Sequence, residues 1–82
     1  MYMKVGKVKH YYDKIGVAII DVLAELKIGD RIKIVRGGED LFEQMIVSMQ
    51  AEHKEIDKAD KGDIIGMKTN EAVKEGAEIF KV

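Results

Sequence analysis

A short phrase that occurs three times in this 82-residue chain constrains its fold more than any other feature. The copies are Leu26–Ile34, Ala59–Met67 and, more weakly, Val73–Val82. Each joins an apolar anchor to a glycine turn and then to alternating apolar residues. Gly adopts positive φ without steric cost, Asp beside it bonds the turn backbone, and the alternation fits a half-buried strand. The phrase therefore predicts a repeated unit of one turn and one strand.

Alternation of apolar and polar residues predicts six short strands around these turns. Their ranges are 3–12, 17–23, 31–36, 42–50, 63–69 and 77–82. The first two strands form a hairpin whose turn ends at Gly16, and Gly6 predicts a bulge or a close backbone approach. We expect Ile20, Ile32 and Ile65 to point into one core.

Six short strands with fairly evenly spaced turns favour a barrel, because closure removes exposed strand edges. We therefore expect an all-β fold, in the form of a small six-stranded antiparallel closed barrel. The length corresponds to a single domain over residues 1–82.

Residues 41–56 are compatible with two structures. Their apolar residues fit one face of a helix, and the segment is rich in helix-forming residue types. A strand instead places Met45, Val47 and Met49 on one face. We favour a strand at 42–50, because the neighbouring segments alternate with period two, and a loop at 51–58, which is too polar for a buried strand. Thr69 or Asn70 is expected to cap a short helical turn before the last strand.

Composition excludes several classes of function. The chain has no Cys, which excludes disulfides, thiol chemistry and Cys-ligated zinc. No apolar run approaches the roughly 20 residues of a membrane helix, and the first residues lack the apolar core of a signal peptide. We therefore predict a cytoplasmic location without membrane contact.

The net charge of −1 conceals an asymmetry between the two halves. Residues 1–38 carry eight basic and four acidic side chains, whereas residues 39–82 carry six basic and eleven acidic ones. The basic half could face a polyanion, but we favour two differently charged surfaces of one domain, because charge asymmetry alone is a weak signal.

The sequence contains no recognisable constellation for catalysis. His10 and His53 are the only histidines, and Glu52-His53-x-Glu55 is a partial set of metal ligands that lacks further members. Many carboxylates are present, but nothing in the sequence marks a convergent pair. We expect no enzymatic activity, no cofactor and no metal.

The strongest binding candidate is a basic row with neighbouring aromatic rings, namely Lys7, Lys9, Tyr11, Arg31 and Lys33. Alternation places the first three on one face of the first strand, and the last two are expected to point outward. Cations meet phosphates and rings stack on bases, so this row predicts a surface for single-stranded RNA. Surface lysines are nevertheless common, and a tyrosine here could simply cover the mouth of a barrel.

The ordered set of phrases resembles the second, β-barrel domain of translational GTPases such as elongation factor Tu. The likeness is carried by Gly16-Val-Ala-Ile-Ile20, by Val47-Ser-Met49 and by the three turn-and-strand copies. It implies a free-standing elongation-factor-like barrel associated with translation or RNA. It implies no GTPase, because the chain has no phosphate-binding loop of the form Gly-x-x-x-x-Gly-Lys-Ser/Thr. It implies no aminoacyl pocket either, because the positions that match that pocket hold Lys7, Val8, His10, Gln50 and Ile64.

A second likeness is carried by Gly6-x-Val8-x-x-Tyr11-Tyr12-Asp13-x-x-Gly16-x-Ala18, which resembles the C-terminal barrel of collagenase-like peptidases. The leading hypothesis is a non-catalytic binding module that meets RNA or a translation-related protein. The alternatives are an accessory module of a separately encoded enzyme and a structural protein that self-associates through an open edge strand. The sequence does not specify an oligomeric state.

Overall fold

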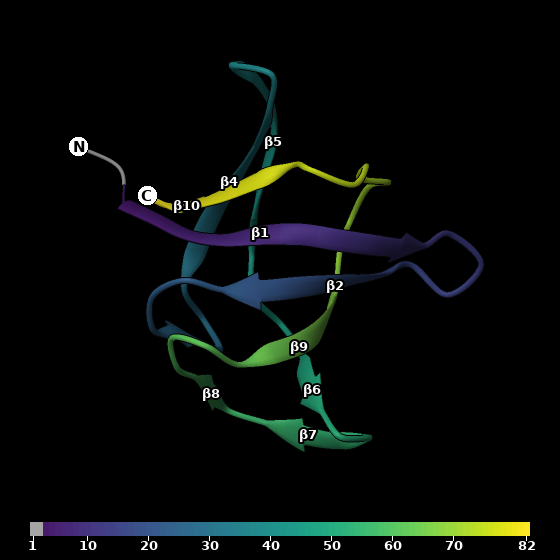
Figure 1. The fold of residues 1–82 in the computed structure, drawn as a ribbon, viewed down its shortest axis with the longest axis vertical. Helices are drawn as coiled ribbons and strands as arrows, with labels where there is room; N and C mark the ends of the chain where they lie inside the picture. Colours follow the sequence, from purple (N-terminus) through teal and green to yellow (C-terminus); the bar gives the residue numbers. More distant parts are fainter. Residues whose placement is uncertain (1–2) are drawn as a thin grey trace.

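The computed structural model describes residues 3–82, and all the regular structure in that range is β-strand (Figure 1). The ten strands are β1 (Met3–Tyr12), β2 (Val17–Val22), β3 (Leu26–Lys27), β4 (Arg31–Arg36), β5 (Glu39–Met45), β6 (Met49–Ala51), β7 (Lys54–Ile56), β8 (Lys58–Ala59), β9 (Ile64–Lys68) and β10 (Glu78–Lys81). Eight of them form one antiparallel sheet in the order β5-β4-β10-β1-β2-β9-β6-β7, and β3 pairs with β8 in a second sheet. The prediction of an all-β antiparallel fold is confirmed.

The predicted closed barrel of six strands is not found in the described part of the chain. β5 and β7 end the strand order of the large sheet, and β5 pairs only with β4. The buried Gln44 of β5 nevertheless reaches the backbone beyond β9. Its Nε2 donates to the carbonyl of Lys68 at 3.1 Å, and the N–H of Asn70 donates to its Oε1 at 2.7 Å. A side-chain bridge, and not a strand ladder, therefore connects β5 to the end of β9.

The three copies of the phrase form the same turn. In each copy the glycine has positive φ, at 93° for Gly29, 95° for Gly62 and 86° for Gly76. In each copy one residue from outside the copy makes two backbone hydrogen bonds to the turn. Its carbonyl accepts the N–H of the glycine, and its N–H donates to the carbonyl of the residue after the glycine. The outside partners are Ile46 for the first copy, Val22 for the second and Val8 for the third, with N···O distances of 2.8–2.9 Å. The repeat predicted from the sequence is thus a repeated pattern of backbone hydrogen bonds.

The first two copies also meet each other. Their anchors Leu26 and Ala59 are directly opposite in the β3–β8 pair, and both side chains are fully buried. One Asp in each turn accepts a backbone N–H three residues earlier, at 2.9 Å in both cases. The acceptor is Asp30 in the first copy and Asp63 in the second, and this Asx bond satisfies one backbone N–H within each turn.

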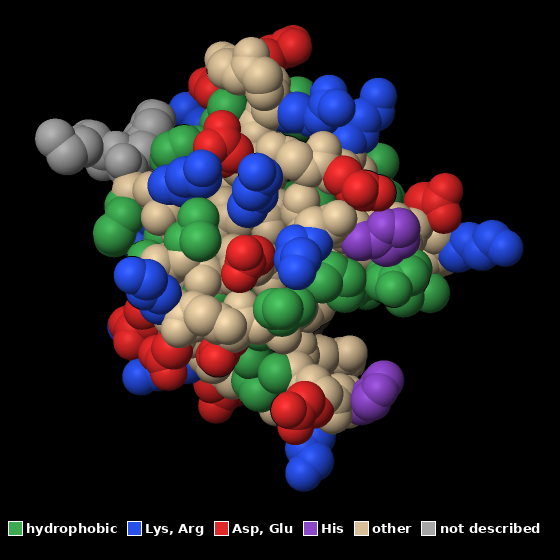
Figure 2. Space-filling view, viewed as in Figure 1, with side chains coloured by type: hydrophobic (Ala, Val, Ile, Leu, Met, Phe, Trp, Pro, Cys, Tyr) green, Lys and Arg blue, Asp and Glu red, His purple; other side chains and the backbone are tan. Residues whose placement is uncertain are grey.

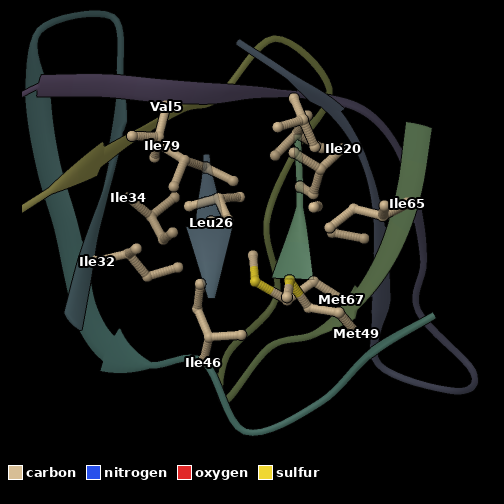
Figure 3. Close-up of a cluster of buried hydrophobic side chains, with 14 of the residues drawn as sticks. Val5, Ile20, Leu26, Ile32, Ile34, Ile46, Met49, Ile65, Met67 and Ile79 are labelled. Carbon is tan, nitrogen blue, oxygen red and sulfur yellow. The ribbon is translucent and has the colours of Figure 1, made fainter. Parts of the chain in front are cut away.

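The core lies inside the curved sheet and consists almost entirely of aliphatic side chains (Figure 3). Ile20, Ile32 and Ile65 are all buried in it, which confirms their predicted inward orientation. Figure 3 shows these side chains and their neighbours from β3, β6 and β10 converging on one interior. Full burial of an Ile side chain contributes about 1.5–3 kcal/mol, so this cluster dominates the stability of the domain.

Gly6 has both of the properties that its position predicted. The pairing register shifts between Lys4 and Gly6, which marks a bulge in β1. A Cβ atom on Gly6 would lie 2.8 Å from Cγ2 of Ile20, closer than real Cβ contacts. Glycine is therefore required here to let β1 and β2 approach.

The predictions for residues 41–58 are wrong in several respects. The predicted strand at 42–50 is broken, because the N–H and C=O of Ile46 are both bonded to the turn at Gly29–Asp30. The break changes the alternation, so Met45 and Val47 are exposed while Met49 is buried. Neither the predicted loop at 51–58 nor the alternative helix is found, since β6 and β7 form a hairpin there and β8 follows.

The predicted helical turn at Thr69 or Asn70 is also absent from the described residues. The N–H of Asn70 bonds the Gln44 side chain, and the N–H of Thr69 donates to the carbonyl of Gly16 at 3.0 Å. These two long-range bonds tie the start of the segment to β5 and to the β1–β2 turn.

Candidate functional site

The five residues predicted to meet RNA do not form one continuous row. A second register shift in β1, between Val8 and His10, inserts Lys9 as an extra residue. A bulge changes which face the following residues occupy. Tyr11 consequently packs against the core, whereas Lys7 and Lys9 are exposed. The prediction that these three side chains share one face is wrong.

The two predicted cations on β4 are paired with acids of the neighbouring strand. Arg31 Nε donates to Glu43 at 3.0 Å, and Lys33 Nζ lies 3.0 Å from a carboxylate oxygen of Asp40. Lys33 is only 9% exposed, so the expectation that it points freely outward is wrong. These pairs reduce the positive field that a phosphate backbone would meet.

The same mixing of charge continues onto β1 and β10. Lys4 forms an ion pair with Glu78, and this neighbouring ammonium lowers the pKa of the Glu78 carboxyl. Figure 2 shows basic and acidic side chains interspersed over this face. A surface of alternating signs is typical of a solvated exterior and gives little electrostatic attraction for a polyanion.

A different part of the surface combines exposed apolar side chains with a concave shape. The groove lies between the end of the β1–β2 hairpin and the end of the β6–β7 hairpin, and its volume is about 310 Å³. Figure 2 shows a hollow between these two hairpin ends. Its apolar lining comes mainly from Tyr12, Ile15, Val17, Ile19 and Ile64. Ile15 is 64% exposed and Ile64 is 55% exposed. Single exposed apolar residues are ordinary, but a contiguous set in a hollow is typical of a binding surface.

The floor of this groove is shaped by a glycine. Gly66 of β9 lies opposite Ile19 of β2 and opposite Gln50 of β6. A Cβ atom at Gly66 would lie 3.2 Å from Cγ1 of Val17, a tight contact. Because Gly66 has no side chain, the outer face of β9 is recessed between β2 and β6, and this deepens the groove.

One rim of the groove is a strained turn. Glu52 and His53 are the two loop residues between β6 and β7, and both have positive φ, at 52° and 66°. A two-residue hairpin loop with positive φ at both positions is a type I′ turn, which strongly prefers Asn-Gly. Non-glycine residues in the left-handed region are strained, and such positions cluster at ligand clamps.

A second hollow lies beside the first residues of the β1–β2 turn and carries polar side chains. His10 Nδ1 is 3.4 Å from a carboxylate oxygen of Glu75, and the His10 ring meets the Tyr12 ring edge-on at a centroid distance of 4.6 Å. Arg36 Nε approaches the carbonyl of Glu75 at 3.5 Å. These exposed contacts tie β1 to the segment before β10, and they do not gather a nucleophile with a base.

Residues 3–82 contain no group of three or more His, Cys, Asp and Glu side chains that could hold a metal ion. In the partial set, Glu52 and His53 form the loop of the β6–β7 hairpin and Glu55 lies in β7, and the three side chains do not gather into such a group. The expectations of no metal, no cofactor and no catalysis stay predictions. No helix in the described range is long and apolar enough to cross a membrane. The cytoplasmic location also stays a prediction.

Sequence reasoning missed the groove, although signals for it were present. Val17-Ala-Ile-Ile20 is apolar at every position, so one of its two faces must lie outside the core. The pair Ile64-Ile65 also indicates an apolar residue outside the core, because adjacent residues of a strand point in opposite directions. The turn at Glu52–His53 gave no signal, since neither residue type is typical of such a turn.

Comparison with known proteins finds similarity to peptidases, whereas the sequence phrases suggested translation factors. No family model matches the chain. It is 37% identical over 78 residues to an uncharacterised protease of Methanocaldococcus jannaschii, an alignment that covers 95% of this chain and 19% of the protease. The chain therefore spans about a fifth of the curated relative that it matches.

Two solved structures that resemble the chain are crystal structures of the C-terminal domain of a U32 peptidase from Geobacillus thermoleovorans. One superposes with a TM-score of 0.88 at 21% identity and covers 95% of this chain and 90% of that domain. Its selenomethionine variant gives a TM-score of 0.86 at 20% identity and covers 93% of this chain and 95% of that domain. At this identity the likeness establishes a shared fold.

These relatives correct the resemblance to elongation factors. The prediction of a free-standing elongation-factor-like barrel, associated with translation and binding RNA, is wrong. The phrases that suggested it are turn-and-strand units, which specify local backbone geometry and are compatible with more than one family of small β-domains. The second likeness, to the C-terminal barrel of collagenase-like peptidases, agrees better with the relatives found.

Proposed function

We propose that this chain is a non-catalytic accessory module of a peptidase, joined to or associated with a larger catalytic part. The observation that carries the proposal is the alignment of nearly the whole chain with one fifth of an archaeal protease. Two crystal structures of a peptidase C-terminal domain with the same fold support it. The small size supports it too, because a thin aliphatic core leaves little room for a catalytic cleft.

The absence of a candidate catalytic centre in residues 3–82 is compatible with an accessory role. Several of the charged side chains form ion pairs between neighbouring strands, such as Arg31–Glu43. None of them lies in a desolvated cleft where a general base or a nucleophile would be activated. An accessory module contributes instead by its surface, through docking or through positioning of a substrate.

The proposal is tested by exchanging modules. The segment of the Methanocaldococcus protease that aligns with this chain is replaced by the chain itself, and hydrolysis of fluorescently labelled casein and gelatin is measured. The control replaces the same segment with a glycine-serine linker of equal length. We expect the chimera to retain proteolysis that the linker control loses, and we expect the isolated chain to hydrolyse neither substrate.

Two results would count against this function. A chimera no more active than the linker control, when the intact protease is active, would show that this chain does not serve as the accessory module. Hydrolysis by the isolated chain that survives repurification would show that the chain is itself an enzyme.

A further inference from the structure

We infer that the groove between the β1–β2 and β6–β7 hairpins docks the module onto a short apolar segment of the peptidase's catalytic part. The inference rests on the proposed function and names the surface and the kind of partner. The groove is lined by exposed apolar side chains, among them Ile15 and Ile64, together with the half-buried Ile19. At about 310 Å³ it accommodates a few apolar side chains, at the lower end of the range for ligand pockets.

The three turn units provide an internal comparison that singles out Ile64. The residue after the turn acid, or after Ala77 in the third copy, begins the following strand and points outward. This residue is Arg31 in the first copy and Glu78 in the third, and each forms an ion pair with an adjacent strand. In the second copy it is Ile64, which is exposed. Because the same fold accepts charged residues at this position, the exposed isoleucine is not a requirement of folding.

The turn on the other rim supports a role beyond folding. Within residues 3–82 the Glu52 and His53 side chains make no hydrogen bond or ion pair, so these contacts do not explain why the two residue types stand at the turn. Asn-Gly would fit the same backbone with less strain. Two side chains at a strained turn on the rim of an apolar hollow have the arrangement of a clamp.

The partner that covers the groove is inferred from two observations. One is the size of the aligned protease, and the other is the contrast between the groove and the charged face over β4 and β5. The aligned protease has about four fifths of its length outside the region that this chain matches. That larger part must contact some face of the module if the two act together. The face over β4 and β5 has its charges paired internally, at Arg31–Glu43 and Lys33–Asp40, so covering it would desolvate those pairs. Covering the groove removes apolar surface from water, which favours docking.

Hydrogen–deuterium exchange on the chimera described above tests the inference. Backbone amides at the two hairpin ends, residues 13–16 and 51–54, are compared between the chimera and the isolated chain. We expect slower exchange at both ends in the chimera, by at least about tenfold, since docking would exclude solvent from both rims.

Two variants of the chimera localise the contact. Ile64→Lys places a charge in the groove opposite Asp21, an acid that favours the new lysine in the free fold. Val47→Lys is the matched control, because Val47 is 63% exposed and lies outside the groove. We expect Ile64→Lys to abolish the added protection and Val47→Lys to retain it. Equal protection in the two variants would overturn the groove as the docking site.

A variant of the Glu52–His53 turn distinguishes backbone strain in the free module from contact between these side chains and the partner. Replacing Glu52 and His53 together by Asn-Gly should raise the melting temperature of the isolated chain and should weaken the protection of residues 13–16 in the chimera. Unchanged protection would refute the role of these side chains as a clamp.

The two proposals fail in distinguishable ways. An active chimera without protection at either hairpin end would leave the accessory function standing and remove the groove. A protected but inactive chimera would leave the docking surface standing and remove the accessory function.

Discussion

The first and third turn units share their backbone hydrogen bonds but differ in the residue after the glycine. Asp30 of the first unit accepts the N–H of Lys27 and lies 3.2 Å from the ammonium of Lys81. The corresponding residue of the third unit is Ala77, which is fully buried. The turn therefore needs the positive-φ glycine and its two strand-crossing bonds, whereas the acid is present in the two turns where the residue after the glycine is not fully buried. Burying a carboxylate completely would carry a desolvation cost that Ala77 avoids.

The largest loss of stability is expected when the buried apolar residue that follows each turn is truncated. Ile32→Ala, Ile65→Ala and Ile79→Ala should each lower the free energy of unfolding by about 2–5 kcal/mol, because each side chain is buried. Urea denaturation measures the losses. A loss below about 0.5 kcal/mol at any of the three, which is typical of surface positions, would show that the unit does not depend on its core residue.

The glycines should matter equally in all three units. Replacing Gly29, Gly62 or Gly76 by Ala should cost about 1–2 kcal/mol, the penalty of a left-handed backbone for an L-residue. A Cβ atom at each position meets no atom of the rest of the molecule within 4 Å, so the cost should come from the local backbone conformation alone. Clearly unequal losses in urea denaturation would mean that the three turns are not equivalent in energy.

The acids should matter less than the glycines and should differ from each other. Asp63→Ala removes the Asx bond and should cost about 0.5–1.5 kcal/mol. Asp30→Ala also removes the ion pair with Lys81, a partly exposed pair that adds about 0.2–1 kcal/mol. Thermal unfolding of both variants, with a double-mutant cycle on Asp30 and Lys81, checks the order. A coupling energy of zero would leave the Asx bond as the only role of Asp30.

The smallest effect is expected at the outward position that follows the turn. Ile64→Arg gives the second unit the residue of the first and should change the free energy of unfolding by no more than about 0.5 kcal/mol. Chemical denaturation of the isolated chain measures it. A loss of more than about 2 kcal/mol would show that Ile64 serves the fold, and it would remove the internal comparison that supports the groove.

Local patterns in the sequence were sufficient to predict most of the strands. The first hairpin, β4, β9 and β10 were predicted within one or two residues, because alternation and glycine turns determine them locally. The failures have long-range causes. Ile46 interrupts its strand because its backbone bonds a turn that lies 16 residues earlier or more, and no local pattern reports this.

The candidate site was less predictable than the fold. An extra residue at Lys9 reversed the side-chain alternation of β1 and turned Tyr11 inward, and one inserted residue leaves no mark in a sequence of mixed lysines and aromatics. The carboxylate partners of Arg31 and Lys33 come from the neighbouring strand β5, so their neutralising effect required the strand pairing to be known. The groove depends on two hairpins that meet only in the folded molecule.

The Gln44 bridge has a consequence for the order in which the molecule is completed. Its partners are the backbone groups of Lys68 and Asn70, which follow it by 24 and 26 residues. During synthesis at the ribosome, β4 and β5 can pair before those residues have emerged, so this seam is left open in the nascent chain. The side-chain amide of Gln44 can therefore bond these partners only after the chain has been synthesised as far as Asn70.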